Sequence, residues 1–162
     1  MDTSTGYPEG FAVTVSWVDG GWNVRSFKDT FTRISHAVET VRNLRSEGAA
    51  FALLNVEEEY FVIVRPGPDR VHALLSDVTM AVDDDYAADI CDELNIDIPD
   101  VDPDELDDID GWADGDFDIL DDLGVSEELL SVLADDQDSD PSEIIERIAE
   151  ELGIVDQLDA VL

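Results

Sequence analysis

Apolar and polar residues alternate along the first 75 residues in a pattern that predicts a β-sheet. In "FAVTVSW", residues 11–17, every second side chain is large and apolar, which is the period of a half-buried strand. Asp19 and Gly20 then predict a hairpin turn, because glycine tolerates positive φ, and "WNVRSF" is expected to return as the second strand. Three more strands are expected in "AFALLNV" (50–56), "YFVIVR" (60–65) and "RVHALL" (70–75), with turn-forming residues between them.

One amphipathic helix is expected between the second and third strands. In residues 32–48 the apolar side chains recur at helical spacing, and Gly48 supplies the C-terminal stop. The predicted order ββαβββ places the fold in the α+β class. Its small antiparallel or mixed sheet would be covered by the helix on one face.

Beyond residue 76 the apolar residues recur at helical spacing, which predicts an acidic helical C-terminal half. The polar faces of these short helices are almost wholly acidic, and like charges one turn apart disfavour an isolated helix. Packing against the sheet, against one another or against a partner must therefore stabilise them. Helices are expected in "DDDYAADICDELN" (83–95), "DFDILDDLG" (116–124), "SEELLSVLAD" (126–135) and "DPSEIIERIAEELG" (140–153).

The composition between these helices favours a flexible linker. Residues 98–116 are rich in aspartate and contain Pro99, Pro103, Gly111 and Gly115. The predicted organisation is a sheet-plus-helix domain with a first acidic helix in 1–97, an acidic linker in 98–116 and an acidic short-helix subdomain in 117–162.

The charge is strongly segregated. The chain has a net charge of -34, from 42 acidic and 8 basic residues. Residues 1–75 hold ten of the acids and seven of the bases, which leaves 32 acids and one base for residues 76–162. General salt adaptation would acidify both halves, so this asymmetry argues for another cause. Direct nucleic-acid binding and binding to an anionic membrane are both disfavoured, and a basic protein partner is expected.

Neither catalysis nor a cofactor is indicated. His36 and His72 lie on different predicted elements and neither accompanies a nucleophile motif, so surface or half-buried positions are expected for both. Cys91 lies on the apolar face of a predicted helix and is expected to be a buried thiol. The N-terminus lacks the basic and apolar regions of a signal peptide, and no apolar run could span a bilayer. A cytoplasmic, non-enzymatic protein is therefore expected.

Residues 100–122, which we call the acidic segment, contain twelve carboxylates and no basic side chain. Such density can imitate the field of a nucleic acid and steer the protein toward a basic, nucleic-acid-binding partner. A solubilising coat alone would not need an aromatic residue such as Trp112 within it. The candidate interaction residues are Asp100, Asp102, Asp104, Glu105, Asp107, Asp108 and Trp112.

A binding module for calcium or for a peptide is the alternative. Reading "DGWADGDFDILD" as a calcium loop places oxygen ligands at its first, fifth, ninth and twelfth positions and a glycine at its sixth. The third position holds Trp112, where a ligand belongs, and the last ligand is Asp rather than the longer Glu. The candidate metal ligands are Asp110, Asp114, Asp118 and Asp121.

Three stretches resemble the actinobacterial family of tRNA adenosine deaminase-associated proteins. They are residues 51–100, with "LLSDVT" (74–79) as the most characteristic part, "FDILDDLGVSEELLSVL" (117–133) and "SEIIERIAEELGI" (142–154). The resemblance covers most of the chain and implies association with the enzyme that converts adenosine to inosine in tRNA. It implies no catalytic residues for this chain.

The residues themselves agree that the chain is not the deaminase. A zinc deaminase needs H-x-E and P-C-x-x-C to hold the metal and its general acid/base. Here His36 precedes Ala37 and Val38, His72 precedes Ala73 and Leu74, and Cys91 is the single cysteine. The expectation is a non-catalytic acidic accessory protein that contacts the basic tRNA-binding surface of a tRNA adenosine deaminase.

Overall fold

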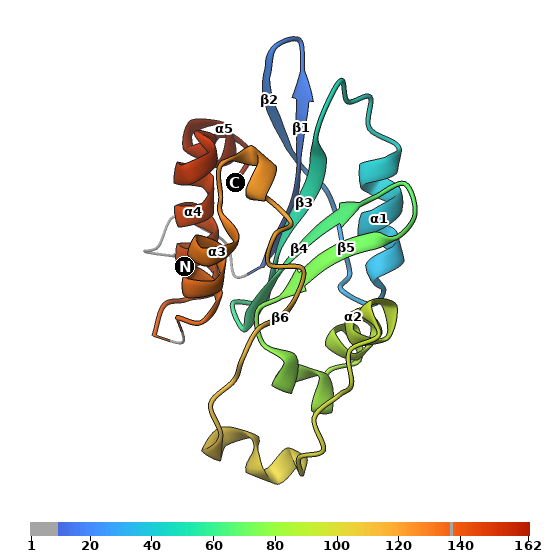
Figure 1. Ribbon diagram of the computed structural model, residues 1–162, viewed down its shortest axis with the longest axis vertical. Coiled ribbons are helices and arrows are strands. Elements are labelled where there is room, and N and C mark those ends of the chain that lie inside the picture. The colour runs from blue at the N-terminus through green and yellow to red at the C-terminus, as the bar shows by residue number, and fades with distance from the viewer. Residues whose placement is uncertain (1–9, 137) are drawn as a thin grey trace.

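A six-stranded antiparallel sheet forms the centre of the molecule (Figure 1). The computed structural model describes residues 10–136 and 138–162, apart from the side chain of Asp107. The strand order is β2-β1-β3-β4-β5-β6. The strands are β1 (Phe11–Val18), β2 (Gly21–Ser26), β3 (Ala50–Val56), β4 (Tyr60–Pro66), β5 (Val71–Leu75) and β6 (Asp114–Gly115). The predicted α+β class is confirmed, and the sheet is antiparallel rather than mixed.

Helices cover both faces of this sheet. The longer ones are α1 (Ile34–Arg42), α2 (Asp85–Leu94), α3 (Glu127–Ala134), α4 (Pro141–Leu152) and α5 (Val155–Val161). Short 3-10 helices occur at η1 (Val78–Val82), η2 (Pro103–Asp108) and η3 (Asp121–Leu123). Figure 1 shows α1 and α2 on one side of the strands and α3, α4 and α5 on the other.

Alternate side chains of the central strands pack into two separate cores, one on each face of the sheet. On β3, Phe51 and Leu53 pack with the C-terminal helices, whereas Ala52 and Leu54 pack with α1 and α2. Because both faces are covered, β3 and β4 are nearly continuous runs of buried apolar residues rather than strict alternations. The C-terminal helices thus bury their apolar faces against the sheet, although their polar faces are almost wholly acidic.

Two parts of the predicted linker are ordered elements. Residues 103–108 form η2, and Asp114 and Gly115 pair with Leu75 and Leu74 as the edge strand β6. Gly115 has a φ of 127°, and a Cβ there would overlap the Ala73 carbonyl oxygen, so only glycine allows this pairing. Residues from 1–97 and from 117–162 share one apolar core. The division into three parts stays a prediction about how the chain behaves in solution.

The stretch 116–124 is less helical than its spacing predicts. Only Asp121–Leu123 form a helical turn, and Gly124, with a φ of 106°, ends it. Ile119 and Leu120 are buried in the core with the C-terminal helices. Burial of these adjacent side chains fixes the stretch as turns, because tertiary contacts outweigh local propensity over so few residues.

A glutamate in the β3–β4 turn positions α4. The Glu58 carboxylate accepts hydrogen bonds from the Ser142 amide and hydroxyl, each at 2.9 Å, and from the Asn55 side-chain amide at 2.7 Å. Ser142 lies in the first turn of α4, where backbone N–H groups lack partners within the helix. Glu58 therefore joins the sheet to a helix 84 residues later in the chain.

Candidate functional site

An acidic groove lies beside α2, at the end of the molecule where the β3–β4 turn, η1 and α2 meet. Its volume is about 890 Å³, and seven carboxylates but one basic residue line it. We call it the acidic groove. It is lined by Phe31, Thr32, Arg33, Glu57, Glu59, Met80, Asp83, Asp84, Asp85, Tyr86, Ala88, Asp89 and Asp92.

Two of the groove carboxylates are held by the fold. Asp84 caps α2 by accepting from the Tyr86 amide at 3.0 Å, and its other oxygen accepts from the Tyr60 hydroxyl at 2.8 Å. Asp89 accepts from the Ile34 amide at 2.8 Å and so satisfies the first N–H of α1. Both caps explain why α1 and α2 begin where they do and why the groove keeps its shape.

The other five groove carboxylates have no such structural bond. No hydrogen bond or ion pair within residues 10–136 and 138–162 involves their side chains. These carboxylates are Glu57, Glu59, Asp83, Asp85 and Asp92. Their charges are therefore not neutralised inside the described part of the molecule. Partial burial and repulsion from Glu57, Asp84 and Asp83 raise the pKa of Glu59. The groove holds negative charge that a cation would relieve.

The predicted interaction residues lie in and around η2, and none of them lines this groove. Asp100, Asp102, Asp104, Glu105 and Asp108 are all exposed, and Asp102 caps η2 by accepting from the Asp104 amide at 3.3 Å. The side chain of the sixth acidic candidate, Asp107, lies outside what the structure describes. The five carboxylates that the structure describes are not enclosed by the fold, so each of them is accessible to a partner.

A second cavity connects the acidic segment with the acidic groove. Its volume is about 440 Å³, and Leu106, Ile109, Asp110 and Gly111 form one wall. Glu59, Met80 and Asp83 line both this cavity and the groove. We call the acidic groove together with residues 100–112 the acidic end. Its three sequence-distant parts, around residues 58, 84 and 106, could not be brought together from the sequence alone.

Trp112 lies in this region with 43% of its surface exposed. Its carbonyl accepts from the Val78 amide at 2.8 Å, which anchors the residue to η1 while the ring stays accessible. Gly111, just before it, contacts the Asp77 carboxylate so closely that a Cβ would not fit. The backbone around Trp112 is thus fixed against the body of the protein.

The candidate calcium ligands fall in four different local structures. Asp110 follows η2, Asp114 lies in β6 and bonds the Gly115 amide at 2.7 Å, Asp118 lies in a turn, and Asp121 begins η3. Among the residues that the structure describes, no group of three or more His, Cys, Asp or Glu is placed to hold a metal ion. Calcium binding stays a prediction.

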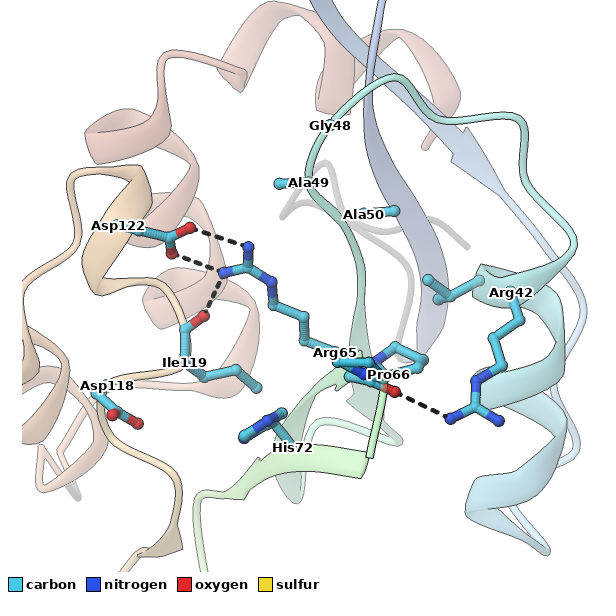
Figure 2. Close-up of a pocket in the computed structure, with 13 residues that line it drawn as sticks. Arg42, Gly48, Ala49, Ala50, Arg65, Pro66, His72, Asp118, Ile119 and Asp122 are labelled. Atoms are coloured by element: carbon cyan, nitrogen blue, oxygen red, sulfur yellow. Dashed lines mark hydrogen bonds and ion pairs between the residues drawn. The ribbon is translucent and has the colours of Figure 1, made fainter. Parts of the chain in front are cut away.

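A third cavity, which sequence reasoning missed, gathers basic residues from α1, β4 and β5. Figure 2 shows Arg65 reaching across it to the stretch that follows β6. The Arg65 guanidinium donates to both Asp122 carboxylate oxygens, at 2.7 and 3.0 Å, and to the Ile119 carbonyl at 2.8 Å. This bidentate bond holds the pKa of Asp122 below its usual value. We call this cavity of about 490 Å³ the Arg65 pocket.

Basic residues in and beside this pocket make bonds within the fold, although Arg70 and Asp116 do not themselves line it. Arg70 donates to Asp116 at 2.8 and 3.3 Å, and the His72 ring lies 3.7 Å from the same carboxylate. Arg42 donates to the Gly67 carbonyl at 3.3 Å, as Figure 2 also shows. The pocket therefore fastens residues 116–122 to β4 and β5. No sequence spacing could have paired these arginines with aspartates roughly fifty positions away.

The two histidines are exposed or half-buried and the cysteine is buried, as the sequence predicts. His36 is exposed with Nε2 at 2.8 Å from the Lys28 carbonyl, and the His72 side chain is 36% exposed. Cys91 is completely buried, as predicted, and burial together with the charge of Asp114 raises its pKa to about 11. A thiol in this state is a poor nucleophile.

Comparison with known proteins identifies the family. Residues 10–155 match the family model described as Rv3753c-like tRNA adenosine deaminase-associated protein. The protein Rv3753c of Mycobacterium tuberculosis is 43% identical over 156 residues, which cover 96% of this chain and 88% of that protein. The chain belongs to this family.

Membership of the tRNA adenosine deaminase-associated family confirms the resemblance drawn from residues 51–154. No solved structure matches the chain, so the fold of this family member rests on the structure described above. No helix in the described part of the chain has the length and apolar character needed to cross a membrane.

Proposed function

We propose that this family member is a non-catalytic accessory protein whose acidic end binds the basic tRNA-binding surface of a tRNA adenosine deaminase. The family description supports the association. The observation that carries the proposal is the convergence of unpaired carboxylates at one end of the fold, where Glu59 and Asp83 line both the acidic groove and the cavity beside η2.

The charge of this end suits a surface that normally binds tRNA. Such a surface carries Lys and Arg spaced to meet phosphates, and binding releases counterions from the acidic partner as it would from RNA. Opposite fields also accelerate the encounter of the two proteins. The accessory protein would then compete with tRNA, protect the free enzyme or tune its choice of substrate, from a cytoplasmic location.

Apolar side chains within the acidic end supply contacts that charge alone does not. Trp112 is exposed to 43%, and Ile98, which lies two residues before the acidic segment, is exposed to 44%. Tryptophan is among the residues that most often supply the binding energy of a protein interface once a partner covers it. We expect Trp112 to contribute more to deaminase binding than any single aspartate.

Calorimetric titration of the full chain into the deaminase of the same organism tests the proposal. At low salt we expect saturable binding, which weakens in physiological salt because ion screening and lost counterion release both oppose it. Trp112→Ala should weaken binding about tenfold or more. Trp17→Ala is the matched control, since Trp17 is 37% exposed but lies on the β1–β2 hairpin.

The absence of heat at both salt concentrations would contradict the proposal. A calcium-binding module would behave in the opposite way, with saturable heat on adding calcium chloride and little dependence on monovalent salt. Turnover and tRNA binding by the deaminase that are unchanged in excess of this protein would rule out competition with tRNA.

A further inference from the structure

The acidic groove contains a buried polar group that lacks a partner. Tyr86 lines the groove and is only 1% exposed, yet among the described residues its hydroxyl makes no hydrogen bond. The Asp29 Oδ2 oxygen is likewise buried and without a partner there. Buried polar atoms are almost always satisfied in folded proteins, so two such atoms in one neighbourhood point to a missing ligand.

The surroundings of this hydroxyl are anionic. The charges of Asp29, Asp89 and Asp84 reach Tyr86 and, after burial, are the main causes of its raised pKa. Asp84 and Asp89 also line the acidic groove. An anionic ligand would be repelled here, whereas a cationic N–H donor could bond the hydroxyl oxygen and a carboxylate oxygen together.

Apolar groups of the groove suit a long aliphatic stem. Phe31, Met80 and Ala88 contribute to its lining. The Phe31 ring centroid is 5.8 Å from that of Tyr86, and the Phe31 amide is held by Asp29 at 2.8 Å. Lysine and arginine bury their stems on apolar surface and extend a charged head, and aromatic faces attract that head.

The geometry does not favour a metal ion as the cation. Seven carboxylates line the groove, but no three metal-binding side chains among the described residues are placed around one point. Calcium would need six to eight oxygens around itself. Charge spread along a groove matches instead a polypeptide that presents basic side chains in sequence.

We propose that the acidic groove receives a lysine or arginine side chain of a basic protein partner, whose stem lies across Phe31 and Met80 and whose cationic head bonds the Tyr86 hydroxyl and Asp29. This inference deepens the proposed function and rests on it for the identity of the partner. The binding of a basic polypeptide to the groove does not depend on the proposed function and can be tested alone.

The probe is a fluorescein-labelled octalysine peptide, and fluorescence anisotropy with the full chain at physiological salt measures its affinity. Glu59→Gln/Asp83→Asn/Asp92→Asn removes three groove charges that make no structural bond. Glu128→Gln/Glu150→Gln/Glu151→Gln removes the same charge from exposed positions on α3 and α4. We expect the groove variant to lose about tenfold in affinity and the control less than about threefold.

Tyr86→Phe separates a binding role from a structural one. Because the hydroxyl has no partner in the described fold, its removal should leave the thermal midpoint unchanged or higher. The affinity for octalysine should fall by about three- to tenfold, as a charge-assisted hydrogen bond is lost. An unchanged affinity, or a lowered midpoint with unchanged affinity, would overturn the assignment of the hydroxyl to a ligand.

Other outcomes also decide the matter. Absence of octalysine binding, or equal losses in the groove and control variants, would show that no groove-specific cation site exists. Deaminase that binds wild type and groove variant equally would overturn the groove but leave the proposed function standing. Groove-specific octalysine binding with no affinity for the deaminase would support the groove and refute the proposed function.

Discussion

At the scale of single residues, buried groups in this protein are fixed by partners far away in the sequence. The Cys91 thiol sits between the sheet and α2, with no exposed surface. Glu58, in a turn, satisfies a helix 84 residues later. Neither residue would attract attention in a search for catalytic groups, yet both determine properties that can be measured directly.

The Cys91 thiol should be inert in the native protein. Its pKa of about 11 leaves about one thousandth of it as thiolate at pH 8, and burial blocks access as well. Reaction with a disulfide reagent such as Ellman's reagent at pH 8 should be at least about a hundredfold slower than in denatured chain. The denaturing control is the same reaction in about 6 M guanidinium chloride. Equal rates in native buffer and in this denaturant would contradict the burial of the thiol.

Glu58→Ala should destabilise the fold by about 1–3 kcal/mol, because the Ser142 amide and hydroxyl lose their acceptor. Glu57→Ala is the matched control. Glu57 and Glu58 both have positive φ, of 55° and 59° respectively, but the Glu57 side chain makes no hydrogen bond within the described chain. Urea unfolding measures both free energies. A control variant as unstable as Glu58→Ala would show that the backbone of the turn, not the carboxylate, matters.

At the scale of elements, ion pairs fasten the acidic stretch after β6 to the sheet. Arg65 and Arg70, from β4 and its following turn, each bind an aspartate of residues 116–122. The strand β6 and the burial of Ile119 and Leu120 complete this attachment. The basic residues of the N-terminal half thus offset part of the repulsion that the acidic half brings.

The Arg65–Asp122 pair should make stability depend on pH in acid. The folded-state pKa of Asp122 is lowered by the Arg65 hydrogen bond, so its stabilisation is present above the ordinary value near 3.8. It is lost as the pH falls through the lowered folded-state pKa. Asp122→Asn should cost about 0.5–1 kcal/mol at neutral pH, since the pair is partly exposed, and nothing in strong acid.

The neighbouring Asp121→Asn is the control for this pH dependence. Asp121 is exposed and its side chain makes no hydrogen bond in the described part of the chain. Chemical unfolding across the acid range measures the difference from wild type for both variants. A loss for Asp122→Asn that persists in strong acid would show that the pair is not its cause.

At the scale of the whole molecule, 34 uncompensated negative charges act against a compact fold. The apolar faces of α3, α4 and α5 overcome this repulsion by burial against the sheet, on the opposite side from α1 and α2. Charge remains concentrated at the acidic end, where the groove carboxylates make no ion pair within the described part of the chain, although Arg33 also lines the groove. Self-repulsion and readiness to bind a basic partner have the same origin.

Sodium chloride should therefore stabilise the isolated protein. Screening shortens the range of repulsion to about 8 Å at physiological ionic strength and to about 3 Å in molar salt. We expect the thermal midpoint and the helical circular dichroism both to rise between dilute buffer and high salt. A flat response would mean that bound counterions or pairing already relieve the repulsion.

The sequence by itself determined the local elements and their type. The alternation in residues 11–17 and the helical stripe of Cys91 are local signals, since side-chain period depends only on backbone geometry. Five strands and the helices α1, α2, α3 and α4 followed from them in the right order, whereas α5 was not expected and 116–124 is mostly turns. The acidity of residues 100–122 was equally visible, but repulsion carries no information about which residues meet.

Only the tertiary structure decided where the charges gather. Sheet register and the β3–β4 turn bring Glu59 beside Asp83, and the fold places Tyr86 where it feels the charge of Asp29. The strand β6 likewise depends on the close approach of Gly115 to β5, a contact that forms only once the sheet exists. Local propensity acts over a few residues, whereas the acidic groove is a product of packing between parts of the chain that the sequence keeps apart.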